Sequence, residues 1–242
     1  MLEDKIIEIK NIKKVCREKT ILNIKEFAVF KNKFNFIIGG NGSGKTSLLN
    51  ILSLVDQDYR GELYYKGQKL NKESQNLNLR RKFAVIWQDP YLYRGSVFYN
   101  IALPLKLRDI SSSQIKIKVK EMAARLEIDE LLEQSAHTLS GGEKQKISIA
   151  RALITDPEIL FVDEATTNLD EESIHFFNSH FADLVTDEMT VVMVSHDRRQ
   201  IKELAEKITL LKGGEVEITK NINNFNFELF GAGIEAPIAE LV

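Results

Sequence analysis

One segment constrains the fold more than any other, because it joins a strand-like stretch to a helix-like stretch through a glycine-rich turn. The turn, GGNGSGKT, matches the pattern G-x-x-x-x-G-K-[ST]. In such a turn the glycines let backbone N–H groups face an anion, Lys45 reaches terminal phosphates, and the Thr46 hydroxyl can ligate Mg²⁺. A plain helix-capping turn is the alternative, but the flanking strand and helix patterns favour a phosphate-binding loop. The candidate nucleotide-binding residues are Gly39, Gly40, Asn41, Gly42, Ser43, Gly44, Lys45, Thr46 and Ser47.

The rest of the chain alternates between strand and helix patterns. The first 38 residues have apolar side chains at every second position, which indicates antiparallel strands leading into a buried strand. A helical pattern covers about 97–133. Beyond it, apolar strands over 159–162 and 189–194 alternate with helices, which is typical of a parallel sheet covered on both faces. We expect a last hairpin around Gly213-Gly214.

Composition narrows the class of protein. The chain has 242 residues with 33 Lys+Arg against 35 Asp+Glu, so its net charge of -2 gives no general attraction to nucleic acid, and we predict no nucleic-acid partner. A single cysteine, Cys16, excludes an internal disulfide and indicates a reducing, cytosolic environment. No apolar run reaches the roughly 18–20 residues that span a bilayer, and the N-terminus shows no secretory signal.

Two adjacent carboxylates follow one of the apolar strand patterns. Asp163 and Glu164 come directly after ILFV. Parallel sheets bind ligands at the carboxyl ends of their strands, so Asp163 is a candidate to hold Mg²⁺ through water. Glu164 is a candidate catalytic residue that orients or deprotonates an attacking water. Acidic residues in an ordinary turn are the alternative.

A third motif identifies a family that the chain resembles. Leu139-Ser140-Gly141-Gly142-Glu143 stands between the phosphate-loop motif and Asp163, and it resembles the signature of ATP-binding-cassette (ABC) transporter nucleotide-binding subunits. The resemblance covers about 5–220. It implies an α/β fold: a P-loop NTPase core with a mainly parallel sheet flanked by helices, an N-terminal antiparallel β region and an inserted α-helical subdomain at about 90–145. Residues 1–220 would form the ATPase domain, and 221–242 are a tail without a predicted role.

The resemblance also implies that two copies of the chain share their sites. In the family, the signature faces the γ-phosphate of ATP held by a second subunit, so two subunits sandwich two ATP molecules head to tail. Ser140, Gly141 and Gly142 would therefore bind nucleotide through a hydroxyl and backbone N–H groups. A serine that caps its own helix, followed by glycine spacers, is the plainer interpretation of these residues.

Three further positions match the pattern of the family. Gln88 resembles the loop glutamine that contacts Mg²⁺ and water, and we count it among the catalytic and metal-binding candidates together with Thr46 and Asp163. Asp170, in TNLD, resembles part of the loop that passes between paired subunits, and His196 resembles the catalytic switch histidine on the γ-phosphate. Each candidate falls at the carboxyl end of a predicted strand, so we expect the side chains to converge on one edge of the sheet with Lys45 and Asp163.

One position departs from the family. An aromatic residue usually stacks on adenine near the N-terminus, and spacing to the phosphate loop places Cys16 there. A thiol offers polarizable contact but no ring face. We therefore expect adenine to be held weakly, or by a neighbour such as Val15, with poor selectivity between bases.

The resemblance implies an ATPase that uses ATP and Mg²⁺ and powers solute transport through separate transmembrane permease subunits, from the cytoplasmic face of the plasma (inner) membrane.

Residues 89–106 would form a groove for a short cytosolic permease helix, with Tyr91, Tyr93 and Phe98 as anchors; ordinary helical core is the alternative. Import is expected, of an oxyanion such as tungstate or a small metabolite such as methionine, with an extracytoplasmic solute-binding protein. A cytosolic ATPase that drives lipoprotein release or cell division is the alternative function.

Overall fold

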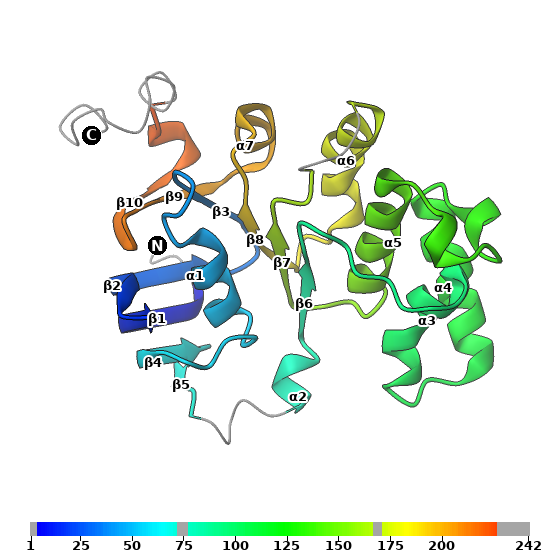
Figure 1. Cartoon of the computed structure of the whole chain (residues 1–242), viewed down its shortest axis with the longest axis horizontal. Helices are drawn as coiled ribbons and strands as arrows, with labels where there is room; N and C mark the ends of the chain where they lie inside the picture. The colour runs from blue at the N-terminus through cyan, green and yellow to red at the C-terminus, as the bar shows by residue number, and fades with distance from the viewer. Residues whose placement is uncertain (1–3, 72–76, 167–170, 227–242) are drawn as a thin grey trace. The chain divides into compact units, whose positions relative to one another are not determined.

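The computed structural model describes residues 4–71, 77–166 and 171–226. Contacts between backbone positions divide the chain into two compact units, residues 1–81 with 188–242 and residues 82–187. Figure 1 shows the elements of both units along the chain. None of the described helices is both long enough and apolar enough to cross a bilayer.

The first unit contains an antiparallel sheet with strand order β2-β1-β4-β5. Alternation of apolar and polar residues places Ile7 and Ile9 in the core, with Ile24 buried on the neighbouring strand. A short turn links the last two strands and contains Lys66, with φ of 49°, and Gly67. The strands are β1 (Lys5–Cys16), β2 (Lys19–Phe30), β4 (Arg60–Tyr65) and β5 (Gln68–Lys69).

A second group of strands in this unit carries the phosphate-loop motif. Strand β3 (Phe34–Ile38) lies between β8 (Thr190–Val194) and β9 (Lys207–Lys212), parallel to both, and β10 (Glu215–Asn221) pairs antiparallel with β9. Helix α1 (Lys45–Leu52) contacts both β8 and β2, so it packs between the two groups of strands, as Figure 1 also shows. The remaining elements are α2 (Leu77–Arg80), α7 (Arg198–Leu204) and the 3₁₀ turn η3 (Ile222–Asn224).

The second unit combines two parallel strands with most of the helices. Strand β6 (Phe83–Ile86) pairs in parallel with β7 (Ile159–Asp163), whose five residues are all buried. Helix α3 packs on α4 and α5, and α5 packs on β6. The helical elements are α3 (Val97–Lys106), α4 (Ser112–Arg125), η1 (Asp129–Leu131), η2 (Ala136–Thr138), α5 (Gly141–Leu153) and α6 (Glu171–Leu184).

These elements confirm the predicted α/β class, with an N-terminal antiparallel region and parallel strands joined by helices. The predicted hairpin around Gly213-Gly214 is the β9–β10 connection. The predicted helical subdomain, about 90–145, falls within the second unit, which also includes β6, β7 and α6. No element had been predicted between α1 and β6, where β4, β5 and α2 lie.

Candidate nucleotide-binding site

The glycine-rich turn leaves the carboxyl end of β3 and leads directly into α1. Gly39 lies so close to β9 that a Cβ there would be 2.1 Å from the Leu211 carbonyl oxygen, which explains why this position needs glycine. Gly44, with φ of 101°, precedes the first residue of α1, and no side chain caps that helix within the described structure. The first N–H groups of α1 are therefore available to an anion.

Polar groups of the turn are arranged as an anion site requires. The Lys45 ammonium is buried and donates hydrogen bonds to the carbonyl oxygens of Gly39 (3.1 Å) and Gly40 (3.2 Å). The Ser43 hydroxyl is buried, and among the described residues it has no hydrogen-bond partner. Thr46 is exposed. An orphaned hydroxyl, a lysine folded onto its own loop and an uncapped helix together fit phosphate groups.

A distant turn supports this loop from behind. The Gly214 N–H donates to the Ser43 carbonyl oxygen (3.0 Å), and the Gly214 carbonyl accepts from the Asn23 N–H (2.8 Å). The β9–β10 turn thus ties the phosphate loop to β2. Sequence patterns had predicted the turn itself, but no signal connected it to Ser43.

His196 lies at the same edge of the sheet as the phosphate loop. It follows β8, whose residues pair in parallel with β3 up to Val194 opposite Ile37, so both strands end at one edge. The His196 side chain is exposed. Hydrogen bonds hold the backbone on its C-terminal side, because the Ser195 hydroxyl accepts from the Asp197 N–H (3.1 Å) and Asp197 caps α7.

Cys16 lies at the end of the β1–β2 hairpin in the same unit. It pairs with Lys19 and is exposed, as is Val15 beside it. The next part of β2 contacts the phosphate loop, since a Cβ on Gly44 would lie 2.7 Å from the Leu22 side chain. The end of the hairpin carries a thiol and an aliphatic side chain at these two positions, and no aromatic ring at either.

Three other predicted residues share one edge within the second unit. Strands β6 and β7 run parallel with Ile86 opposite Val162; Gln88 follows the carboxyl end of β6, Asp163 is the last residue of β7, and Glu164 follows it. Asp163 is 4% exposed, whereas Glu164 is half-buried. The backbone of Glu164 has φ of 44°, an uncommon conformation for a residue with a side chain.

The signature residues form the start of α5. The Ser140 hydroxyl accepts a hydrogen bond from the Glu143 N–H (3.2 Å), and the Glu143 carboxylate accepts one from the Ser140 N–H (2.7 Å), which makes a capping box. The plainer interpretation of this serine is therefore present in the structure. It does not exclude a ligand, because an accepting hydroxyl still has a proton to donate.

A groove in the second unit is lined by β6 and by the facing sides of α3 and α5. Aromatic and aliphatic side chains predominate, and Tyr91 and Leu107 are both more than two-thirds exposed. Phe98 does not line it, unlike Tyr91 and Tyr93. Its lining includes Trp87, Tyr91, Tyr93, Leu107, Arg108 and Arg151.

A residue missed in the sequence, Asn100, holds one wall of this groove. Its side chain is fully buried, accepts a hydrogen bond from the Tyr93 N–H (2.7 Å) and donates to the carbonyl oxygens of Tyr93 and Ser96 (3.0 Å each). The loop before α3 is thus fastened to the helix by one amide. An asparagine in an otherwise apolar helix pattern was the available signal.

Two further observations concern Asp170 and the predicted metal site. Asp170 lies outside the described residues, so its predicted place between subunits stays a prediction. Over residues 4–71, 77–166 and 171–226, no group of three or more His, Cys, Asp or Glu could hold a metal ion. Mg²⁺ does not need such a cage, because it retains waters and binds phosphates together with one or two protein oxygens.

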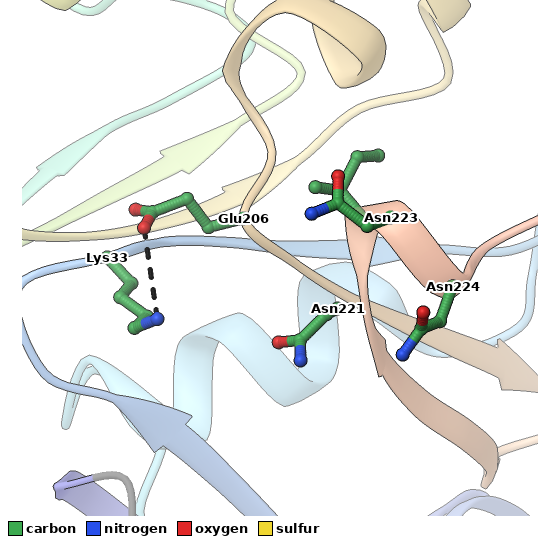
Figure 2. A pocket seen from close by; sticks show the side chains of 6 residues that line it. Lys33, Glu206, Asn221, Asn223 and Asn224 are labelled. Atoms are coloured by element: carbon green, nitrogen blue, oxygen red, sulfur yellow. Dashed lines mark ion pairs between the residues drawn. The ribbon is translucent and has the colours of Figure 1, made fainter.

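A polar pocket lies at the opposite edge of the strands that carry the phosphate loop. Figure 2 shows Lys33 and Glu206 facing each other (Nζ to Oε1, 3.9 Å), with Asn221, Asn223 and Asn224 around them. Lys33 precedes β3, whereas the phosphate loop follows it. The pocket is therefore separate from the nucleotide site.

The fold and the glycine-rich loop define the class, a P-loop nucleotide-binding protein. A family model described as "ABC transporter" matches residues 22–167. The chain is 35% identical to the tungstate uptake system ATP-binding protein TupC of Peptoclostridium acidaminophilum, over 87% of this chain and 96% of that protein. It is 33% identical to the lipoprotein-releasing system ATP-binding protein LolD of Aquifex aeolicus, over 89% of this chain and 98% of that protein. The chain belongs to the ABC transporter family of ATP-binding proteins.

A solved structure agrees with this assignment. The dimeric ATP-binding cassette MJ0796, in a post-hydrolysis state with ADP and Pi, matches with a TM-score of 0.79 and 28% identity, over 90% of this chain and 99% of that chain. The predicted family, the fold class and the ATPase activity are confirmed: the protein is an ABC ATPase.

Proposed function

We propose that the protein is the ATP-hydrolysing subunit of a transport system, working through separate transmembrane permease subunits from the cytoplasmic face of the inner (plasma) membrane. One observation carries the proposal: the phosphate loop combines a buried Ser43 hydroxyl, without a hydrogen-bond partner among the described residues, with a helix N-terminus that no described side chain caps. Both features leave hydrogen-bond donors that an anion would satisfy. Family membership supports ATP as the source of that anion.

The residues around the phosphates have distinct proposed roles. Backbone N–H groups of 39–44 and the Lys45 ammonium neutralise charge on the β- and γ-phosphates, and His196 contacts the γ-phosphate from the same edge. Glu164 orients or deprotonates the attacking water. Mg²⁺, when bound with ATP, supplies charge neutralisation, and Thr46, Gln88 and Asp163 are the residues that would hold it.

A second copy of the chain completes each site in this proposal. Ser140, Gly141 and Gly142 donate hydrogen bonds to the γ-phosphate held by the partner, and Asp170 lies between the two subunits. The dimeric cassette similar to this chain supports a paired arrangement. Catalysis then requires closure of the dimer, and opening after hydrolysis is the motion passed to the permease.

Mixing two inactive variants tests the shared site. Lys45→Met prevents a subunit from binding its own ATP, while Ser140→Asp retains a good helix cap and places a negative charge against the γ-phosphate. Neither variant should hydrolyse ATP alone. A one-to-one mixture should recover about a quarter of the wild-type sites, because half of the dimers are mixed and each has one intact site.

The outcome separates the alternatives. Recovery of activity in the mixture supports head-to-tail sites. Failure to recover, while both variants remain folded by circular dichroism, would contradict them. Glu164→Gln is the matched control, because it should bind ATP and dimerise without hydrolysis.

The proposed cargo is an oxyanion or a small metabolite that enters the cell, delivered by an extracytoplasmic solute-binding protein. The similarity to a tungstate uptake ATPase supports import. Reconstitution with the permease that co-purifies, followed by uptake of labelled tungstate, tests this cargo. ATP hydrolysis that the presence of tungstate and binding protein leaves unchanged would contradict it.

A second function has a specific observation in its favour, the similarity to a lipoprotein-releasing ATPase over nearly its whole length. In that case the membrane partner would have few spans and a large extracytoplasmic domain. Affinity purification of the tagged ATPase decides between the two functions. A multi-span permease with a binding protein supports import, and a few-span partner supports lipoprotein release.

A further inference from the structure

The polar pocket at the start of β3 lies apart from the nucleotide site and within the first unit. Its volume is about 320 Å³. Figure 2 shows Lys33 and Glu206 on one side of it and the asparagine side chains of the last described segment on the other. The lining residues are Lys33, Glu206, Asn221, Ile222, Asn223 and Asn224.

Hydrogen bonds fix Glu206 between β3 and the turn η3. Its N–H donates to the Phe34 carbonyl oxygen (3.0 Å), and its Oε2 accepts from the Phe34 N–H (3.0 Å). Its own carbonyl oxygen accepts from the Ile222 N–H (3.0 Å). The second carboxylate oxygen, Oε1, accepts no hydrogen bond from any described residue. This oxygen is therefore held in place for a donor that comes from outside the chain.

The ion pair across the pocket is a loose one. Lys33 Nζ lies 3.9 Å from Glu206 Oε1, which is beyond hydrogen-bond distance. The two side chains are 31% and 47% exposed, so solvent screens the pair and its contribution to stability is small. A ligand that brings its own charges can therefore insert between the two groups at little cost.

The charges of the pocket restrict which ligand fits. A simple anion on Lys33 would meet the carboxylate of Glu206, and a simple cation on Glu206 would meet the ammonium of Lys33. Among the described lining residues there is no aromatic ring on which a nucleobase could stack. A small molecule with one ammonium and one carboxylate group satisfies both charges at once.

The third wall of the pocket is rich in amides. Asn221, Asn223 and Asn224 all line it, and within the described structure none of their side chains has a hydrogen-bond partner. Each amide can donate through its N–H groups and accept through its oxygen. Such a wall matches a ligand side chain that also donates and accepts, such as a carboxamide.

We propose that this pocket binds a free α-amino acid with a carboxamide side chain. The ligand carboxylate accepts a hydrogen bond from the Lys33 ammonium, and the ligand ammonium donates one to Glu206 Oε1. The carboxamide exchanges hydrogen bonds with the asparagine wall. This site is additional to the proposed ATPase function and does not depend on it.

Calorimetric titration of the full-length protein with L-glutamine tests the site. Three matched compounds each lack one group: glutaramic acid lacks the ammonium, the corresponding amine lacks the carboxylate, and L-leucine has an apolar end in place of the amide. L-glutamine should bind at least about tenfold more tightly than each of them, because each loses one set of hydrogen bonds. No binding of L-glutamine at millimolar concentration, or equal affinities for all four compounds, would overturn the proposal.

Two substitutions in the pocket and one outside it locate the binding. Glu206→Gln retains an acceptor for the Phe34 N–H but removes the charge, and Lys33→Gln removes the cation. Each should weaken L-glutamine about tenfold. Lys212→Gln is the matched control, because Lys212 pairs with Glu217 (3.6 Å) on the same hairpin without lining the pocket. Equal weakening by all three variants would contradict the assignment.

Competition with nucleotide separates this pocket from the phosphate loop. Saturating ATP should leave the stoichiometry of L-glutamine binding unchanged, because the two sites adjoin opposite ends of β3. Displacement of L-glutamine by ATP would overturn the proposal. The comparison of compounds and this competition both use wild-type protein, so they decide even if a variant fails to fold.

Discussion

The β9–β10 turn offers a sharp test of how the phosphate loop is held, because two adjacent glycines have different surroundings. Gly213 has φ of 54° and open space where a Cβ would stand. At Gly214, with φ of 84°, a Cβ would lie 2.3 Å from the Ile21 carbonyl oxygen. Gly213→Ala should therefore cost only the left-handed strain, about 1–2 kcal/mol. Gly214→Ala adds displacement of the turn and loss of its hydrogen bonds to Ser43 and Asn23, about 1 kcal/mol each, for about 3–4 kcal/mol in all.

Two measurements compare these variants. Urea denaturation gives the free energy of unfolding, and titration with a fluorescent ATP analogue gives the affinity for nucleotide. Gly214→Ala should weaken nucleotide binding by about tenfold, because the Ser43 carbonyl loses the N–H behind it. Gly213→Ala should leave the affinity unchanged. Equal losses of stability and affinity in the two variants would refute the idea that Gly214 supports the loop.

Three further predictions concern single side chains. Cys16→Tyr should raise the affinity for ATP, measured by calorimetry with GTP alongside, because a ring can stack on adenine where a thiol cannot; no gain in ATP affinity would contradict adenine binding there. Asn100→Ala should lower the free energy of unfolding by about 3 kcal/mol in urea, since three hydrogen bonds to Tyr93 and Ser96 are lost. Glu143→Ala should cost about 1 kcal/mol through the capping box and spare ATP hydrolysis, whereas Ser140→Asp should retain the cap and abolish hydrolysis; hydrolysis lost in both would contradict separate roles.

Local motifs were the most predictable part of the molecule. The order of strand, glycine-rich turn and helix around Lys45 depends on neighbours in sequence, and the structure places all three as predicted. The same holds for Asp163 at the end of a buried strand and for Ser140 at the start of a helix. Glycine, capping residues and apolar periodicity act over a few residues, so a sequence displays them directly.

Features that depend on distant segments were not predictable. Gly214 supports Ser43, and Asn100 holds Tyr93 by hydrogen bonds. The sequence around Gly214 predicts a turn and the sequence around Asn100 predicts a helix, whether or not these contacts form. The environment of Arg151 was not predictable either, because an arginine near the end of a helix is expected to be a solvated cation favoured by the helix dipole. Only packing shows that its Nη1 is shielded from solvent.

Strand β3 has consequences for the order in which the protein becomes functional. Both of its neighbours, β8 and β9, lie more than 150 residues further along the chain, as do Leu211 and Gly214 behind the loop. During synthesis, the nucleotide-binding sequence leaves the ribosome early, yet its framework is made last. A nascent chain that ends before β9 has the complete motif without the surface against which it folds. Nucleotide binding therefore reports that translation has reached the final hairpin, and ribosome-bound chains stalled before residue 207 and after residue 221 should differ in ATP retention.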